Sequence, residues 1–330
     1  MRLKLHKFCI LFWLVLLTAC ASVVETSPDA TLVIRDVPAR VADGFFDSNG
    51  VQIRFTDIGE GKSVVLLHGY TDHLDRPWVE SGIAQRLVGE GYRVISMDCR
   101  GHGKSEKPHK VSGYGIEMVE DVIRLLDYLD VNTAHIVGHS MGGTIANKLR
   151  EMYPERSTST TLVGSGWWQE GQEAFGLLEL GDTSADLLAG RGVETLLRAL
   201  VPEGQPPLTE DFVNQFTDAL TAKNDIQALA AVFDGLAELA VTESDLRENR
   251  VPTLALIGEI DPVKISVDTL QTVMANLEVK VIEGEDHGSI IFAPQFMDVL
   301  LSFLAKQVAD SLRESEIGAW KETSNPNIIR

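Results

Sequence analysis

The chain has 330 residues, of which 44% are hydrophobic and 23% are charged, so it can bury a large core. Its 29 basic and 48 acidic residues give a net charge of −19. Because nucleic-acid binding needs clustered Lys and Arg, this balance excludes a typical nucleic-acid partner, and it disfavours strongly anionic substrates.

The N-terminus has the pattern of a signal peptide. Basic residues within 1–7 precede an uncharged apolar run at 8–17. At about ten residues, the run is too short to cross a bilayer core as a helix. We therefore expect residues 1–19 to be removed and to take no part in the fold.

The apolar run ends in the letters LTAC at 17–20, which resemble the lipobox of bacterial lipoproteins. In such proteins the peptide is cut before the Cys and the thiol is lipidated. The resemblance implies lipid on Cys20 and a protein anchored to a membrane of the bacterial cell envelope. An ordinary secretory signal that ends near Ala21 is the alternative. Residues 20–43 are expected to tether the lipid to the folded domain.

Short apolar runs alternate with helical patterns from Gly50 onward. The run at 51–55 alternates apolar and polar residues, which is typical of an edge strand, whereas the later runs are continuous and suit strands buried on both faces. These later runs lie at 63–69, 92–98, 134–140, 160–165, 253–261 and 278–284. Helices are predicted between them at 78–88, 116–126 and 141–152. The alternation predicts a mostly parallel sheet with right-handed crossovers.

One interval interrupts this alternation. Residues 166–250 contain helical segments, most clearly at 187–200 and 226–239, and no convincing strand. This pattern predicts a helical insertion between two strands of the sheet. The predicted organisation is a signal peptide at 1–19, a tether at 20–43, a sheet domain at 44–165 and 251–312, a helical cap at 166–250 and a C-terminal tail at 313–330.

The letters IVGHSMGGTIA at 136–146 place Ser140 between glycines, where a predicted strand turns into a predicted helix. The glycines allow a tight turn that exposes the hydroxyl. A serine hydroxyl is a weak nucleophile until a base removes its proton, and it needs N–H donors where negative charge develops. The backbone N–H of Met141 is the first expected donor. His139 is expected to point elsewhere, as a packing or pocket residue.

His287 and Asp261 are the expected base and acid. His287 follows the last predicted strand, at the edge where open α/β sheets place their sites. Asp261 follows the preceding strand and would hold the tautomer of the imidazole. Asp286 competes with Asp261 because it is adjacent to His287, but directly adjacent side chains rarely make this contact. Glu259 is the reserve candidate.

The order Ser140, Asp261, His287, each past the end of a strand, resembles that of the α/β-hydrolases. The resemblance extends over about 44–312. It implies the α/β-hydrolase fold, which has a mostly parallel central sheet, helices on both faces and a helical cap, here at 166–250.

Two further motifs carry the same resemblance. The letters HGYTDH at 68–73 resemble the HG turn that follows the third strand of the family, which implies that the backbone N–H of Tyr70 is the second oxyanion donor. The letters DCRGHGKS at 98–105 resemble the family's D-x-R-G-x-G-x-S turn. We interpret this second turn as structural, with Asp98 and Arg100 bracing loops near the site.

The resemblance is closest to the capped branch of the family, which includes epoxide hydrolases, haloalkane dehalogenases, C–C bond hydrolases, haloperoxidase-like enzymes and small esterases. The first two use an aspartate nucleophile, so Ser140 argues against both. The expected enzyme is a serine hydrolase that forms an acyl-enzyme, with a small to medium uncharged ester as its small-molecule substrate. Thioesters, lactones and C–C bonds beside a ketone use the same machinery and remain open.

Trp167 and Trp168 lie at the entry to the predicted cap. They are expected either to line an apolar substrate pocket or to pin the cap to the core, and the sequence does not separate these roles. No metal-ligand spacing, phosphate loop or dinucleotide fingerprint occurs, so no metal or cofactor is expected. The competing class is a non-enzymatic envelope lipoprotein that binds a partner, and the intact Ser, His and Asp set argues against it. The sequence leaves the oligomeric state open.

Overall fold

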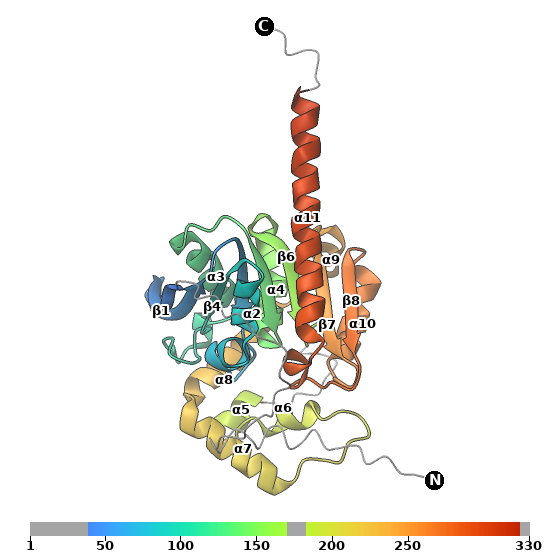
Figure 1. Ribbon diagram of the computed structural model, residues 1–330. Coiled ribbons are helices and arrows are strands. Elements are labelled where there is room, and N and C mark those ends of the chain that lie inside the picture. Colours follow the sequence, from blue (N-terminus) through green and yellow to red (C-terminus); the bar gives the residue numbers. More distant parts are fainter. Residues whose placement is uncertain (1–38, 170–182, 324–330) are drawn as a thin grey trace, which may run out of the picture. The chain divides into compact units, whose positions relative to one another are not determined.

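A central sheet carries the fold (Figure 1). The computed structural model describes residues 39–169 and 183–323, which belong to the compact unit Asp36–Arg330. The predicted signal peptide, Cys20 and most of the predicted tether lie outside the described residues. Within the described ranges, no helix is both long and apolar enough to cross a bilayer.

The described sheet has eight strands in the order β1-β2-β4-β3-β5-β6-β7-β8. Their bounds are β1 Ala39–Ser48, β2 Val51–Ile58, β3 Lys62–Leu67, β4 Tyr92–Met97, β5 Ala134–His139, β6 Ser157–Val163, β7 Thr253–Gly258 and β8 Leu277–Ile282. Strand β2 runs antiparallel to β1 and β4, and the remaining pairs are parallel. The carboxyl ends of β3 to β8 therefore meet at one edge of the sheet.

Helices connect the strands. The described helices longer than one turn are α2 Ile83–Gly89, α3 Ile116–Tyr128, α4 Met141–Met152, α5 Thr183–Leu188, α6 Glu194–Ala199, α7 Glu210–Lys223, α8 Ile226–Gly235, α9 Glu243–Glu248, α10 Lys264–Val273 and α11 Phe296–Thr323, together with the π-helix η2 Asp75–Glu80. The short 3₁₀ helices are η3 Val111–Gly113, η4 Pro154–Arg156, η5 Leu236–Leu239 and η6 Ile290–Phe292.

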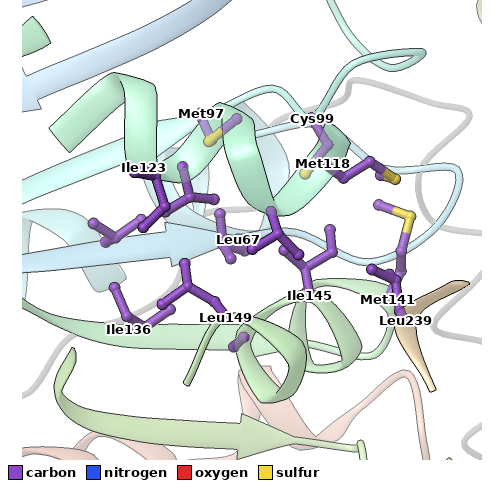
Figure 2. Close-up of a cluster of buried hydrophobic side chains, with 14 of the residues drawn as sticks. Leu67, Met97, Cys99, Met118, Ile123, Ile136, Met141, Ile145, Leu149 and Leu239 are labelled. Carbon is purple, nitrogen blue, oxygen red and sulfur yellow. The ribbon is translucent and has the colours of Figure 1, made fainter. Parts of the chain in front are cut away.

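The core lies on both faces of the sheet, because successive side chains of a strand point in opposite directions. Along β3, Val65 and Leu67 belong to one buried cluster, whereas Val64 and Leu66 belong to another. The first cluster joins the sheet to α3 and α4, and Figure 2 shows Leu67 beside Ile145. The second cluster joins the sheet to α2 and to the first part of α11. This layering confirms the predicted fold class.

The interval between β6 and β7 contains α5 to α9, and Figure 1 shows α5 to α8 gathered at one end of the sheet. Helix α8 and the turn η5 contribute to the main core cluster through Val232 and Leu236. Helices α5 and α7 pack with α8 around a smaller cluster of their own, which includes Leu187, Leu220 and Leu229. We refer to residues 166–250 as the helical insertion.

Two helices that the sequence predicts as continuous are divided in the structure. The predicted helix at 78–88 is broken at Gly82, which has a φ of 81°. The predicted helix at 187–200 is broken where Gly190 and Gly192 have φ values of 78° and 66°. Glycine adopts this left-handed conformation without steric cost, and a right-handed helix cannot continue through it.

Strand β1 is absent from the sequence-based prediction. Because β1 pairs with the outer side of β2, the prediction that the run at 51–55 is an edge strand is wrong. Strand β1 begins at Ala39, inside the segment 20–43 that was expected to be a tether, so that boundary is wrong at its C-terminal end. The letters ARVADGFFDS have no regular alternation, and the pairing with β2 shifts register between Ala39 and Val41 and again between Val41 and Gly44. Pairing with β2, rather than a local pattern, makes this segment a strand.

Candidate active site

Ser140 lies in a sharp turn between β5 and α4, with φ 52° and ψ −115°. Its N–H donates to the carbonyl of Val163 at 2.8 Å, which ties the turn to the end of β6. Two glycines permit the close packing. A Cβ on Gly138 would lie 2.1 Å from the carbonyl oxygen of Gly142, and a Cβ on Gly142 would lie 2.3 Å from that of Leu67. Larger residues would therefore displace the turn.

The structure brings the three predicted residues together. The Nε2 atom of His287 lies 2.9 Å from Oγ of Ser140, and its Nδ1 atom lies 3.0 Å from Oδ2 of Asp261. Asp261 is buried, and its Oδ1 accepts the N–H of Val263 at 2.8 Å. Each residue follows the carboxyl end of a different strand: β5, β7 and β8. The contacts form a chain from carboxylate to imidazole to hydroxyl.

Gly164 allows the end of β6 to pack against this chain of contacts. It has a φ of 55°, and a Cβ at this position would lie 3.3 Å from Nδ1 of His287 and 3.4 Å from Oδ2 of Asp261. Any larger side chain at this position would press against the imidazole of His287 and the carboxylate of Asp261. Glycine avoids that contact and lets the backbone lie beside the pair.

Burial and charge act on His287 in opposite directions. Burial lowers the pKa of its imidazole, but the carboxylate of Asp261 outweighs this effect, so that the pKa is raised above its usual value. The side chain of His287 is 13% exposed and that of Asp261 is fully buried, so solvent screens this pair weakly. Asp261 thus favours the imidazolium that would form when the ring accepts a proton.

The alternative acids make other contacts. Oδ1 of Asp286 accepts the N–H groups of Gly288 and Ser289 at 3.0 and 2.9 Å, which closes the turn after His287. Oε2 of Glu259 accepts the N–H of Gly284 at 3.0 Å. The described hydrogen bonds to the imidazole therefore favour Asp261 over both alternatives.

His139 contributes more than the sequence indicates. Its Nε2 donates to the backbone carbonyl of His287 at 3.1 Å, and the two ring centroids are 5.5 Å apart. Burial lowers the pKa of His139 to about 4, so this ring is neutral when it donates. His139 thereby holds the loop that carries His287. The sequence places His139 beside Ser140, but it contains no signal for the direction of the ring.

The two predicted oxyanion donors lie on segments next to Ser140. Met141 begins α4, and a Cβ on Gly69 would lie 3.4 Å from Cβ of Ser140, which places the Tyr70 turn beside the serine. Within the described part of the chain, the N–H groups of Tyr70 and Met141 donate to no protein acceptor. Both are therefore available to an oxygen atom bound near Ser140.

Trp167 and Trp168 are both buried. Nε1 of Trp167 donates to the carbonyl of Val241 at 2.8 Å, and the N–H of Val241 donates to the carbonyl of Trp168 at 3.1 Å. These contacts join the first and last parts of the helical insertion. They lie within the insertion, whereas the N–H of Trp167 donates to the carbonyl of Ser266 on α10 at 3.3 Å. That contact favours the pinning role for Trp167, and the role of either residue in substrate binding stays a prediction.

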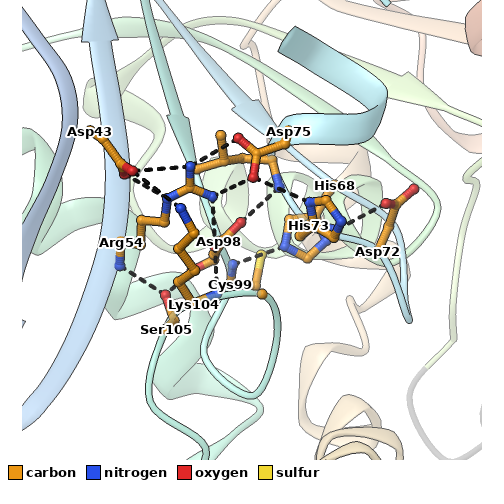
Figure 3. A network of polar contacts seen from close by, with 12 residues as sticks. Asp43, Arg54, His68, Asp72, His73, Asp75, Asp98, Cys99, Lys104 and Ser105 are labelled. Atoms are coloured by element: carbon orange, nitrogen blue, oxygen red, sulfur yellow. Dashed lines mark hydrogen bonds and ion pairs between the residues drawn. The ribbon is translucent and has the colours of Figure 1, made fainter. Parts of the chain in front are cut away.

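A charged network supports the turn that carries Tyr70 (Figure 3). Oδ1 of Asp98 accepts the N–H of Leu74 at 2.7 Å, and Nη1 of Arg54 lies 3.3 Å from Oδ2 of Asp98. Arg54 also pairs with Asp75 and Asp43, each with a closest contact of 2.6 Å. These contacts agree with the bracing role expected of Asp98. Arg54 and Asp75 were not singled out in the sequence, because only the fold joins β2 to the segment after β3.

Arg100 braces a second loop, as expected. Its guanidinium pairs with Asp121 at 2.6 Å and donates to the carbonyl of Gly113 at 2.7 Å.

Among the residues that the structure describes, no group of three or more His, Cys, Asp or Glu side chains is placed to hold a metal ion.

Comparison with known proteins supports the fold described above. A family model described as alpha/beta hydrolase fold matches residues 62–182. A carboxylesterase crystal structure from the Thaumarchaeon Nitrososphaera gargenis superposes with a TM-score of 0.65 at 23% identity, covering 81% of this chain and 100% of that one. The fold is that of the alpha/beta-hydrolases.

Relatives in sequence support the alpha/beta-hydrolase superfamily. The AB hydrolase superfamily protein YfhM of Bacillus subtilis is 26% identical over 236 residues, which cover 66% of this chain and 80% of that protein. A 2-hydroxy-6-oxononadienedioate/2-hydroxy-6-oxononatrienedioate hydrolase of Pseudomonas putida is 38% identical over 130 residues, which cover 38% of this chain and 44% of that protein. Four curated relatives of 31–38% identity are matched over only 19–44% of their own length. Two of these four are named dihydrolipoyllysine-residue acetyltransferase components of an acetoin cleaving system. The names of the Bacillus subtilis and Pseudomonas putida relatives above support a hydrolase and leave its substrate undecided.

Proposed function

We propose that this alpha/beta-hydrolase is a serine hydrolase that forms an acyl-enzyme, and that it is a carboxylesterase for small to medium uncharged esters. The observation that carries the proposal is the continuous contact from Asp261 through His287 to Ser140, with distances of 3.0 and 2.9 Å. A non-enzymatic binding protein has no need of a buried carboxylate, an imidazole and a partly buried serine in this order.

In the proposed reaction, Nε2 of His287 accepts the proton of Ser140 as Oγ attacks the ester carbonyl carbon. The resulting oxyanion accepts hydrogen bonds from the N–H groups of Met141 and Tyr70. The C–O bond to the alcohol then breaks, and the imidazolium of His287 returns its proton to the leaving oxygen. A water molecule repeats the sequence on the acyl-enzyme and releases the acid.

The charge of the chain supports an uncharged ester as substrate. The chain carries a net charge of −19, which slows the encounter with anionic molecules. The carboxylesterase of Nitrososphaera gargenis shares the fold over its whole length. Fold similarity alone does not determine substrate, so the chemical class rests on the serine and its hydrogen-bond partners.

Replacement of the serine tests the proposal. Ser140→Ala should lower kcat/KM for p-nitrophenyl acetate by about a thousandfold or more, as is usual for a member of such a triad. A fluorophosphonate probe should label the wild type and leave Ser140→Ala unlabelled, because only an activated serine reacts. Ser244→Ala, which removes an exposed serine on α9, is the matched control and should label normally. A Ser140→Ala variant that keeps most of its activity would refute the assignment.

Hydrolysis of a C–C bond beside a ketone is the second candidate. It is favoured by the 38% identity to the Pseudomonas putida hydrolase, whose name specifies 2-hydroxy-6-oxo dienedioate substrates. The same serine, histidine and aspartate would serve both reactions. Parallel assays with p-nitrophenyl esters and a 2-hydroxy-6-oxo dienoate separate the two, because the larger kcat/KM identifies the class that the site fits.

We also propose that Cys20 is lipidated and holds the protein at a membrane of the bacterial cell envelope. The support is the LTAC sequence at 17–20 after a short apolar run. Two or more acyl chains hold a protein firmly at a bilayer, whereas a single chain binds marginally. An enzyme anchored in this way would meet esters beside the envelope membrane that holds it, at the periplasmic face or the outer membrane.

A further inference from the structure

The side chain of Tyr70 connects the proposed oxyanion site to the helical insertion. Its hydroxyl donates to the backbone carbonyl of Leu229, in α8, at 2.7 Å. Its ring lies 5.8 Å from the ring of Phe233, one turn further along the same helix. Burial raises the pKa of Tyr70 well above its usual value, so the hydroxyl keeps the proton that it donates.

The backbone of the same residue lies in a turn that needs outside support. Thr71, the next residue, has a φ of 66°, a strained conformation for a β-branched residue. The N–H of Asp72 donates weakly to the carbonyl of Gly69 at 3.2 Å, which is the local bond of this turn. Such a turn keeps its shape only when its surroundings hold it in place.

The sheet domain and the helical insertion both contact the side chain of Tyr70. On the sheet side, His102 packs edge-on against the ring of Tyr70 at 5.8 Å. On the other side, Leu229 and Phe233 of α8 hold the hydroxyl and the ring. Tyr70 contacts both the main core cluster and the cluster of the insertion. A displacement of α8 would therefore move the residue whose N–H is the predicted second oxyanion donor.

We propose that Tyr70 is a positioning residue through which docking of α8 sets the direction of the second oxyanion N–H. This inference rests on the proposed acyl-transfer function. Such coupling makes turnover sensitive to the position of the insertion. Displacement of this N–H weakens its hydrogen bond to the oxyanion of the transition state more than its contact with the bound ester. A substrate that displaces α8 outward would be turned over with a lower kcat, whereas its KM would change less.

The test is Tyr70→Phe, which keeps the ring and removes only the contact to Leu229. We expect kcat for p-nitrophenyl acetate to fall about fivefold, the factor for one net hydrogen bond, while KM changes less than about twofold. Affinity for a trifluoromethyl ketone, which forms an oxyanion on Ser140, should fall by the same factor as kcat/KM. A merely structural role would change Tm without this parallel loss.

Phe233→Leu tests the same connection from the side of the insertion. It should also lower kcat, and its effect should be less than additive with Tyr70→Phe because both variants weaken the packing of the same residue, Tyr70, against α8. Tyr153→Phe is the matched control, since Tyr153 donates to Glu120 on α3, and it should leave kcat unchanged. If Tyr70→Phe does not fold, Phe233→Leu decides.

The outcomes separate this inference from the function on which it rests. If wild-type protein takes no fluorophosphonate label, the proposed function fails. If the wild type is labelled and active but both variants keep kcat and inhibitor affinity within about twofold, Tyr70 supports the fold alone and the inference is overturned. A fall in kcat with matched loss of inhibitor affinity supports it.

Discussion

Ser140 occupies a backbone conformation that residues with a Cβ rarely adopt, with a φ of 52°. Such strain costs on the order of 1–3 kcal/mol and persists only where the surroundings determine it. Here the N–H of Ser140 is bound by Val163 at 2.8 Å, and its carbonyl accepts the N–H of Thr144 at 3.0 Å. The N–H and C=O of Ser140 are thus both hydrogen-bonded, and the turn directs Oγ toward His287. The strained backbone conformation is therefore what orients the hydroxyl.

The acid is the first prediction at the residue scale. Asp261→Asn should lower kcat/KM by more than about a hundredfold, because the amide cannot stabilise the imidazolium and disturbs its tautomer. Asp286→Asn should cost less than about tenfold, since the amide oxygen can still accept the N–H groups of Gly288 and Ser289. Steady-state kinetics on p-nitrophenyl acetate rank the two variants. The reverse ranking would move the acid to Asp286, and two small effects would leave Glu259 as the candidate.

The pKa of His287 gives a second prediction at this scale. The ring must be neutral to accept the proton of Ser140, so activity is lost as pH falls through its pKa. Because Asp261 raises that pKa, the acid limb of kcat/KM should lie above the usual value of 6.5 for histidine. Asp261→Asn should shift the limb of its residual activity to lower pH. A limb that does not move with Asp261 would assign it to another group.

At the scale of elements, α8 is anchored to the sheet domain near both of its ends. Its first residue is preceded by the cap Asp225, which accepts the N–H of Ala228 at 3.0 Å and pairs with His109 at 2.9 Å. Glu238, after α8, accepts the N–H of Ile116 at 3.3 Å. Together with Tyr70, these contacts join α8 to loops of the sheet domain. An insertion docked in this way should limit the size of the substrate.

Substrate length tests this limit. In a series of p-nitrophenyl esters, kcat/KM should peak at short to medium acyl chains, because the docked insertion restricts the space near Ser140. Long-chain triglyceride should be hydrolysed slowly. A rate that keeps rising through long chains, or that increases sharply at an emulsion interface, would instead indicate a lipase whose insertion moves.

At the scale of the whole molecule, the order of the strands assembles the site. Strands β5, β6, β7 and β8 are parallel neighbours, so the segments after β5, β7 and β8 meet at one edge although they are far apart in sequence. The contact from Ser140 to His287 spans 147 residues. The geometry of the candidate site therefore depends on the complete sheet rather than on any one motif.

Attachment to a membrane is the prediction that concerns the whole protein. Metabolic labelling with a radioactive fatty acid should mark the wild type in a bacterial host, and Cys20→Ser should abolish the label and release the protein from the membrane fraction. The mature wild type should begin at Cys20. Label that survives Cys20→Ser, or a mature N-terminus at another residue, would contradict the proposed anchor.

Much of the fold and the three central site residues could be predicted from local patterns. The continuous β-branched runs predicted β3 to β7 because buried strands need apolar side chains on both faces. The run at 278–284 predicted β8 too, but β8 lies at the edge of the sheet and only its last residue is buried, so the expected burial on both faces was wrong there. The letters around Ser140 predicted its turn, since glycines at 138 and 142 leave space that other residues would fill. His287 and Asp261 were predicted because side chains past parallel strand ends converge. Strand β1 escaped prediction because its pairing with β2, not its own pattern, defines it.

The amino-acid sequence by itself determined the chemistry that is possible, because residue type and chain order decide which groups follow which strand. Only the tertiary structure decided which groups meet. In the structure, Asp261 rather than Asp286 contacts the imidazole of His287. His139 donates to the carbonyl of His287, and the hydroxyl of Tyr70 donates to the Leu229 carbonyl in α8. The physical reason is that side-chain direction and long-range pairing depend on packing between distant segments, which no local pattern specifies.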